Sequence, residues 1–262
     1  MKRSKSLGMV ALLGLMVAGL FIAISCTPTN PVQKNCVVWI GDSIFALSGE
    51  EATALTKLSN QTYRTYYVSG AQMDGGTVRT IPAQYTQAKN ADRNIRTVIM
   101  DGGGNDVLIG AGTSCNATYP NGTLSQACYN IINKVEAVNN TLWQDMINDG
   151  VKNIIDQGYY YSSNRQLWVV SDVFQGRTKQ EFANMAAKNP SIKMVFIDPK
   201  DDPYFDKSKV ASYTIADGIH PTTAASGELA NLLWNAMVNN NIEQTTSCSS
   251  SSSSTSSSGG CN

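Results

Sequence analysis

The 262-residue sequence lacks several features that would point to common functions. It has one histidine and six cysteines but no Cys-x-x-Cys pair or Cys/His cluster, so a structural zinc site is not expected. Basic and acidic residues are equal at 20 each and form no basic stripe in the sequence, so a nucleic-acid partner is not expected. The glycine run before Asn105 fails the dinucleotide-binding spacing at Val107. Four aspartates between residues 198 and 206 lack the spacing and the bidentate glutamate of a calcium loop, so no metal is expected.

The N-terminal segment has the composition of an export signal, which we place at residues 1–25. Three basic residues lie among the first five, and residues 7–24 carry no charge. Residues 23–26, Ala-Ile-Ser-Cys, resemble a bacterial lipobox with alanine where leucine is usual. Such a motif implies that Cys26 is lipidated and holds the protein to the membrane, with residues 26–35 as a short tether. Ordinary cleavage and an uncleaved anchor are the alternatives. All three place the domain outside the cytoplasm, at a bacterial cell envelope or secreted.

The other cysteines agree with export. Cys115 and Cys128 bracket a turn-rich stretch and are expected to form a local disulfide, which would add about 3 kcal/mol of stability in the loop-entropy model. Cys36 opens an apolar run and is expected to be a buried free thiol rather than a nucleophile, and the pairing of Cys36, Cys248 and Cys261 is left open. Residues 243–262 form a serine-rich tail that cannot bury apolar area and is expected to be disordered. The tail resembles the polyserine linkers of secreted bacterial enzymes that degrade polysaccharides.

Between these ends, apolar runs alternate with stretches of helical spacing. Expected strands are 36–40, 63–69, 97–100, 151–160 and 193–197, and expected helices are 44–59, 78–93, 129–148, 167–188 and 222–239. The fourth strand could instead be 167–173, but the helix ending at Gly150 should lead directly into a strand. The alternation predicts a three-layer α/β/α fold over residues 36–242, with a flavodoxin-like five-stranded parallel sheet and helices on both faces.

Polar or glycine-rich segments follow the expected strands, at the edge of the sheet where such folds bind ligands. These segments are Gly41-Asp42-Ser43, Gly70, Gly103-Gly104-Asn105-Asp106 and, before the last helix, Asp217-Gly218-Ile219-His220. Each alone has a simpler explanation, such as a helix cap or a turn. Together and in this order, the segments resemble the four motif blocks of the SGNH hydrolases, also called GDSL-type esterases and lipases. The resemblance covers roughly residues 36–240.

The resemblance implies a serine esterase that needs no cofactor. Ser43 would be the nucleophile, His220 its general base and Asp217 the residue that orients His220. His220 is the only imidazole in the chain, so it is the only side chain of its kind available near neutral pH. The oxyanion hole would consist of the backbone N–H groups of Ser43 and Gly70 and the side-chain amide of Asn105.

The substrate class stays open at this stage. A small-molecule ester and an ester linked to a polysaccharide are both compatible with the sequence, and the serine-rich tail favours removal of acetyl groups from polysaccharide. A non-catalytic lipoprotein that binds an envelope component is a second class, and a flavodoxin-like nucleotide or flavin protein is a third. Tyr159, Tyr160 and Tyr161 follow a strand end and either line a substrate groove or pack in the interior.

Overall fold

The computed structural model describes residues 30–47, 49–242 and 248. The expected signal peptide, Cys26 and the serine-rich tail apart from Cys248 lie outside the described residues. Within the described part of the chain, no helix combines the length and the apolar composition needed to cross a bilayer.

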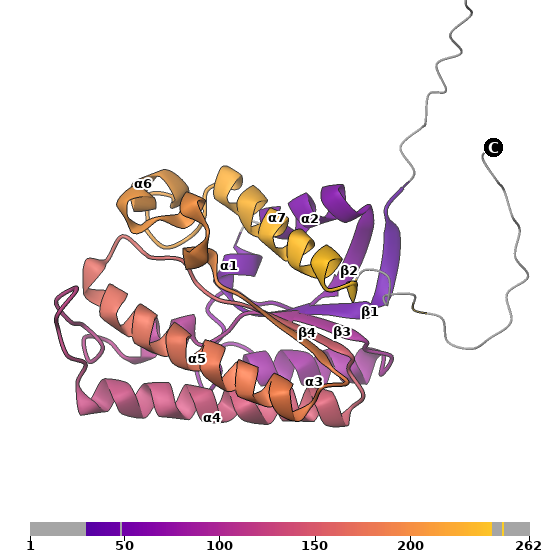
Figure 1. The fold of residues 1–262 in the computed structure, drawn as a ribbon, viewed down its shortest axis with the longest axis horizontal. Coiled ribbons are helices and arrows are strands. Elements are labelled where there is room, and N and C mark those ends of the chain that lie inside the picture. The colour runs from indigo at the N-terminus through magenta and orange to yellow at the C-terminus, as the bar shows by residue number, and fades with distance from the viewer. Residues whose placement is uncertain (1–29, 48, 243–247, 249–262) are drawn as a thin grey trace, which may run out of the picture. The chain divides into compact units, whose positions relative to one another are not determined.

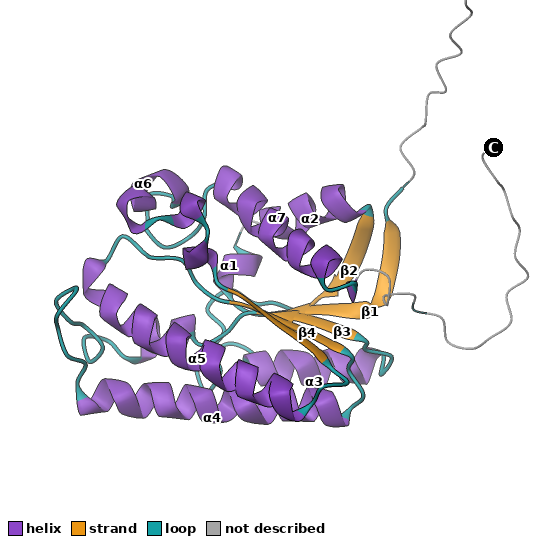
Figure 2. Cartoon of the chain, in the orientation of Figure 1, coloured by secondary structure: helices purple, strands orange, loops and turns teal. Residues whose placement is uncertain are grey.

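The core of the domain is a five-stranded parallel sheet in the order β2-β1-β3-β4-β5 (Figure 2). The strands are β1 (Val32–Ile40), β2 (Gln61–Thr65), β3 (Thr97–Met100), β4 (Asn153–Gln157) and β5 (Lys193–Ile197). The predicted α/β fold is confirmed. The fourth strand lies within 151–160 as expected, and 168–188 is helical.

Helices cover both faces of the sheet. Figure 1 shows α3 (Ile81–Ala91), α4 (Gln126–Asn148) and α5 (Trp168–Lys188) on one face, and α2 (Glu50–Ser59) and α7 (Thr223–Asn239) on the other. Side chains alternate along β1, so Val38 and Ile40 join the core under α3–α5, whereas Val37 and Trp39 join the core under α2 and α7. This burial on both faces explains why β3 and the second half of β1 are nearly continuous apolar runs, whereas β2, at the edge of the sheet, is polar.

Several boundaries differ from the expected ones. The helix expected at 44–59 is two helices, α1 (Ser43–Ala46) and α2, because Gly49 adopts a left-handed conformation with φ of 62° between them. Pro82 lies in the first turn of α3, where its missing N–H leaves no helical bond unmade. β2 begins and ends earlier than expected, although backbone N–H groups of Tyr66 and Val68 still donate to the carbonyls of Trp39 and Gly41.

The end of α4 was foreseeable from its glycine. Gly150 has φ of 88°, its N–H donates to the Ile147 carbonyl, and the N–H of Val151 donates to the Met146 carbonyl. This pair of bonds is a Schellman motif, and it directs the chain from α4 into β4.

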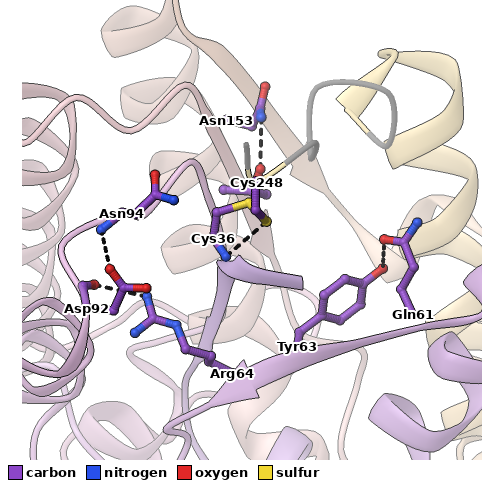
Figure 3. Close-up of a disulfide and its surroundings, with 9 residues drawn as sticks. Cys36, Gln61, Tyr63, Arg64, Asp92, Asn94, Asn153 and Cys248 are labelled. Carbon is purple, nitrogen blue, oxygen red and sulfur yellow. Dashed lines mark hydrogen bonds between the residues drawn. A yellow bond between two sulfur atoms is a disulfide. The ribbon is translucent and has the colours of Figure 1, made fainter. Parts of the chain in front are cut away.

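The structure contains two disulfides among the described residues. The Cys115–Cys128 bond is confirmed. The expectation that Cys36 is a free thiol is wrong, because Cys36 is bonded to Cys248 (Figure 3). The two residues are 212 positions apart, and Cys248 packs against the core cluster that α7 shares with β1. The second disulfide joins the segment after the last helix to a central strand.

Candidate active site

The turn after β1 positions Ser43 and requires glycine at position 41. A Cβ added to Gly41 would lie 2.1 Å from Oδ1 of Asp101, and φ at Gly41 is 151°. The side chain of Gln84 holds the same residue from both sides, accepting from the Gly41 N–H at 2.7 Å and donating to its carbonyl at 2.9 Å. The backbone N–H of Asp42 donates to Asp101 Oδ1 at 2.7 Å. These bonds fix the turn that leads into α1.

The residue that caps α1 is Asp42. Its Oδ1 accepts a hydrogen bond from the backbone N–H of Ile44 at 2.9 Å, as an N-cap does. Ser43 is the first helical residue and lines a pocket at this edge of the sheet. In the Asp42-Ser43 pair, the aspartate therefore caps the helix, and the serine side chain is not needed for capping.

Asp217 and His220 form a direct pair. His220 Nδ1 lies 2.5 Å from Asp217 Oδ2, and Asp217 Oδ1 accepts from the backbone N–H groups of Ile219 and His220. Burial opposes ionisation of Asp217, but the hydrogen bond to the His220 ring and these two N–H groups outweigh it and lower the pKa of Asp217 to about 2. Asp217 is therefore an anion across the range in which a histidine titrates.

The loop that carries His220 is held on two sides. The hydroxyl of Tyr160 donates to the Ile219 carbonyl at 2.8 Å, and the Ile215 N–H donates to the His220 carbonyl at 2.9 Å. The second ring nitrogen of His220, Nε2, is buried and has no hydrogen-bond partner among the residues that the structure describes. Ile219 lines the same pocket as Ser43, so this nitrogen belongs to a residue adjacent to the pocket wall.

Asn105 also lines that pocket, and its side chain is tied to the loop after β2. Its Nδ2 donates to the Ala71 carbonyl at 2.9 Å, while Gln72 Nε2 donates to the Asn105 carbonyl at 3.2 Å. Gly70, next to Ala71, has φ of 78°, which favours glycine at this position. The neighbouring Asp106 accepts from the backbone N–H groups of residues 73 and 74 and ties the two loops further. The loops of Gly70 and Asn105 thus form one hydrogen-bonded unit.

Comparisons with known proteins support the fold. No family model and no curated protein matches the sequence. Solved structures do match, over most of the chain. An acetyl xylan esterase has a TM-score of 0.52 and 14% identity, covering 78% of this chain and 99% of that one. A GDSL-like lipase from Bacteroides thetaiotaomicron has a TM-score of 0.50 and 16% identity, covering 83% and 92%. A carbohydrate esterase family 2 enzyme with a carbohydrate-binding domain, from Corynascus thermopiles (Myceliophthora fergusii), has a TM-score of 0.52 and 14% identity, covering 82% and 69%.

The chain shares its fold with these esterases and with the GDSL-like lipase. At these identities the likeness concerns the fold, and the site rests on its own geometry.

The sequence left open whether Tyr159 lines a groove or packs in the interior, and it gave no sign of its role between two loops. The hydroxyl of Tyr159 donates to Asp42 Oδ2 at 2.8 Å and accepts from the Gly104 N–H at 3.1 Å. It therefore joins the nucleophile turn to the loop of Asn105. A Cβ added to Gly104 would lie 2.8 Å from the Tyr159 ring, which explains a glycine there. The run of tyrosines after β4 was the available signal, but it did not distinguish lining from packing.

Buried carboxyl groups gather at the carboxyl ends of β1, β3 and β4. Burial raises the pKa of Asp42, and burial together with the charge of Asp42 raises the pKa of Asp101 well above its usual range. Burial raises the pKa of Asp156 to about 7 and that of Glu51 to about 8. Asp217 alone among these five acids has a lowered pKa, and it is the one that contacts His220.

The described residues contain no cluster of three or more His, Cys, Asp or Glu side chains suited to a metal ion. The aspartates between 198 and 206 have local roles instead. Asp198, Asp202 and Asp206 each accept from the backbone N–H two residues later and cap short helical turns. Lys179 pairs with Asp198 and Asp201.

Proposed function

We propose that this protein is a serine esterase that hydrolyses carboxylic esters through an acyl-enzyme. The observation that carries the proposal is the Asp217–His220 pair, in which His220 Nε2 is buried and has no partner among the described residues. Ile219, next to His220, lines the same pocket as Ser43 and Asn105. Leaving a buried imidazole nitrogen without a hydrogen-bond partner costs stability. A catalytic role explains why the protein keeps such a nitrogen, since a general base must be free to accept the proton of a serine hydroxyl.

In the first half of the reaction, the Ser43 oxygen attacks the ester carbonyl carbon while its proton passes to His220 Nε2. The carbonyl oxygen becomes an oxyanion, which the Asn105 amide and the backbone N–H groups of Gly70 and Ser43 would hold. The intermediate then expels the alcohol, whose oxygen takes the proton from His220. Asp217 keeps the proton of the imidazole on Nδ1 and stabilises the imidazolium, because its low pKa keeps it ionised.

In the second half, a water molecule gives its proton to His220 Nε2 and its oxygen attacks the acyl carbon. Collapse of this second intermediate breaks the bond to Ser43, and His220 returns the proton to the serine oxygen. The acid leaves and the enzyme is restored. The residues needed for both halves are the same, so no cofactor enters the proposal.

Replacing Ser43 with alanine tests the proposal. We expect Ser43→Ala to lower kcat on p-nitrophenyl esters by a factor of about 1,000 or more and to abolish labelling by a fluorophosphonate. Ser212→Ala, at an exposed position on α6 (Val210–Tyr213), is the matched control and should keep both properties. Full esterase activity in Ser43→Ala would overturn the proposal. Folded wild-type protein that hydrolyses no ester and gives no Ser43 adduct would favour a non-catalytic binding protein.

A second candidate within the same chemistry is a carbohydrate esterase. Two of the structural neighbours are an acetyl xylan esterase and a family 2 carbohydrate esterase, and the serine-rich tail favours the same class. Release of acetate from acetylated xylan, measured beside hydrolysis of p-nitrophenyl esters, distinguishes this candidate from an esterase of small molecules.

We also propose that the domain acts outside the cytoplasm, tethered through a lipid on Cys26. The Cys36–Cys248 and Cys115–Cys128 bonds support an oxidising compartment. Incorporation of labelled palmitate into the full chain, and its loss in Cys26→Ala, would establish the anchor. Wild-type protein recovered unlabelled from the medium would contradict it.

A further inference from the structure

The cleft beside Ser43 extends toward the N-terminal end of α5. The empty space within it is about 660 Å³, a figure that includes open solvent at its mouth. Ser43 and Asn105 line it together with residues from the start of α5. A substrate carbonyl at Ser43 would therefore have one substituent directed into this cleft.

The wall at the start of α5 is largely apolar, although Ser171 also lines it. Val107, Leu167, Val170 and Phe174 all line the cleft, and each is at most 9% exposed. They belong to the same core cluster under α3–α5, so their positions are fixed by packing. A Cβ added to Gly103 would lie 2.4 Å from the Phe174 ring, which shows how closely this ring packs on the glycine loop.

The two tyrosine hydroxyls at the cleft are already engaged within the protein. Tyr159 donates to Asp42 and accepts from the Gly104 N–H, while Tyr160 donates to the Ile219 carbonyl. A sugar ring placed here would bury hydroxyl groups against aliphatic side chains, and each unpaired buried hydroxyl is costly. An alkyl chain has no such requirement.

The position of His220 indicates which half of an ester enters the cleft. The leaving oxygen must face His220 Nε2 to receive its proton, so the alcohol lies on the side of the histidine loop. Part of that loop reaches the surface, since the Asp217 side chain is 39% exposed and Ile215 is 43% exposed, although Nε2 itself is buried. The acyl substituent is then the group left for the enclosed apolar side.

We propose that this cleft is the acyl-binding site and that it selects acyl chains longer than acetyl, from butyryl upward. The proposal rests on the esterase function above and names the half of the substrate that sets specificity. The residues that determine specificity are Val107, Leu167, Val170 and Phe174. These residues select the acyl group and do not contact the alcohol.

Chain-length profiling of the full-length protein tests the proposal. The substrates are p-nitrophenyl acetate, butyrate and hexanoate, with each kcat/KM divided by the rate of alkaline hydrolysis of the same ester. Transfer of one methylene into an apolar site is worth about a factor of four, so kcat/KM should rise by about 15-fold from acetate to butyrate. Equal or falling values from acetate to butyrate in the wild type would overturn the acyl assignment.

Substitutions in the wall should change the profile in a chain-length-dependent way. Val170→Phe fills the cleft and should lower kcat/KM for butyrate at least about tenfold more than for acetate, a difference of two lost methylenes. Leu167→Phe makes the same change at a less buried position, and it replaces Val170→Phe in the test if that variant does not fold. Val238→Phe, on the exposed face of α7, is the matched control and should leave the profile of the wild type unchanged.

The outcomes separate this proposal from the one on which it rests. Equal losses on acetate and butyrate in both wall variants would overturn the acyl assignment and leave the esterase function standing. Absence of activity on every ester, with no Ser43 adduct, would overturn the esterase function and the acyl site with it.

Discussion

Glu51 is a carboxyl group buried between α2 and the end of β4, and its protonation should govern how stability depends on pH. It is 1% exposed, and its described side-chain partner is Gln157, whose Nε2 donates to Glu51 Oε2 at 3.3 Å. Oε1 of each of these two residues is buried without a partner among the described residues. A protonated carboxyl supplies the donor that two such acceptors lack. Burial accordingly raises the pKa of Glu51 from 4.5 to about 8.

The sign and size of the effect follow from this shift. Between pH 4.5 and 8 the folded state holds a proton on Glu51 that the unfolded state has lost, so the free energy of unfolding falls as pH rises through this window. One pKa unit corresponds to about 1.4 kcal/mol, which gives a loss of about 3–5 kcal/mol by pH 8. The penalty is absent below pH 4.5, where both states are protonated.

Glu51→Gln removes the ionisation while keeping an acceptor for Gln157. We expect the variant to unfold at nearly the same urea concentration as the wild type at pH 5, and to be more stable by about 3–5 kcal/mol at pH 8. The measurement is urea unfolding followed by circular dichroism at both pH values. Glu50→Gln, at the adjacent and partly exposed position, should follow the wild type. Parallel pH dependence of the wild type and Glu51→Gln would refute the reasoning, because Asp156 titrates in both proteins and cancels in the difference.

Two further predictions concern the proposed reaction. Asn105→Ala removes one oxyanion donor and should lower kcat by a factor of about 100 to 1,000 with a smaller change in KM, measured on p-nitrophenyl butyrate; an unchanged kcat would exclude this role. Tyr159→Phe removes the hydroxyl between Asp42 and Gly104, and should cost about 1–3 kcal/mol of stability because a buried carboxylate loses its donor. It should also lower kcat more than KM, and a stability loss with unchanged kcat would make Tyr159 a purely structural residue.

The fold was predictable because its signals are local. Buried strands such as Thr97–Met100 are apolar on both faces, and Gly150 marks the end of α4 by a conformation that only its neighbours in sequence determine. The placement of Ser43 and Asn105 at one pocket followed from a general property of parallel sheets, whose carboxyl ends meet at one edge. The assignment of roles to them depended on the family resemblance and stays a prediction.

The contacts that were missed join segments far apart in the sequence. Gln84 reaches Gly41 across 43 positions, Tyr159 reaches Asp42 across 117, and Cys248 reaches Cys36 across 212. Glutamine, tyrosine and cysteine at these positions carry no periodic or capping signal, because their partners are brought to them by the packing of the sheet. The glycine run at residues 102–104 is an intermediate case. It predicts that other groups pack closely on this loop, but it does not predict that these groups are Phe174 and Tyr159.

The two tyrosines after β4 explain how three separate loops can hold a common geometry. The proposed reaction needs a nucleophile, an oxyanion donor and a base on different loops, and errors of about 1 Å among them are costly. Tyr159 contacts the first two loops through Asp42 and Gly104, and Tyr160 contacts the third through Ile219. Both tyrosines follow β4, a strand that is buried along its whole length and paired with β3 and β5, so their backbone is anchored in the middle of the sheet. Substitutions at these tyrosines should therefore act on kcat, whereas substitutions along α5 should act on which acyl chain is accepted.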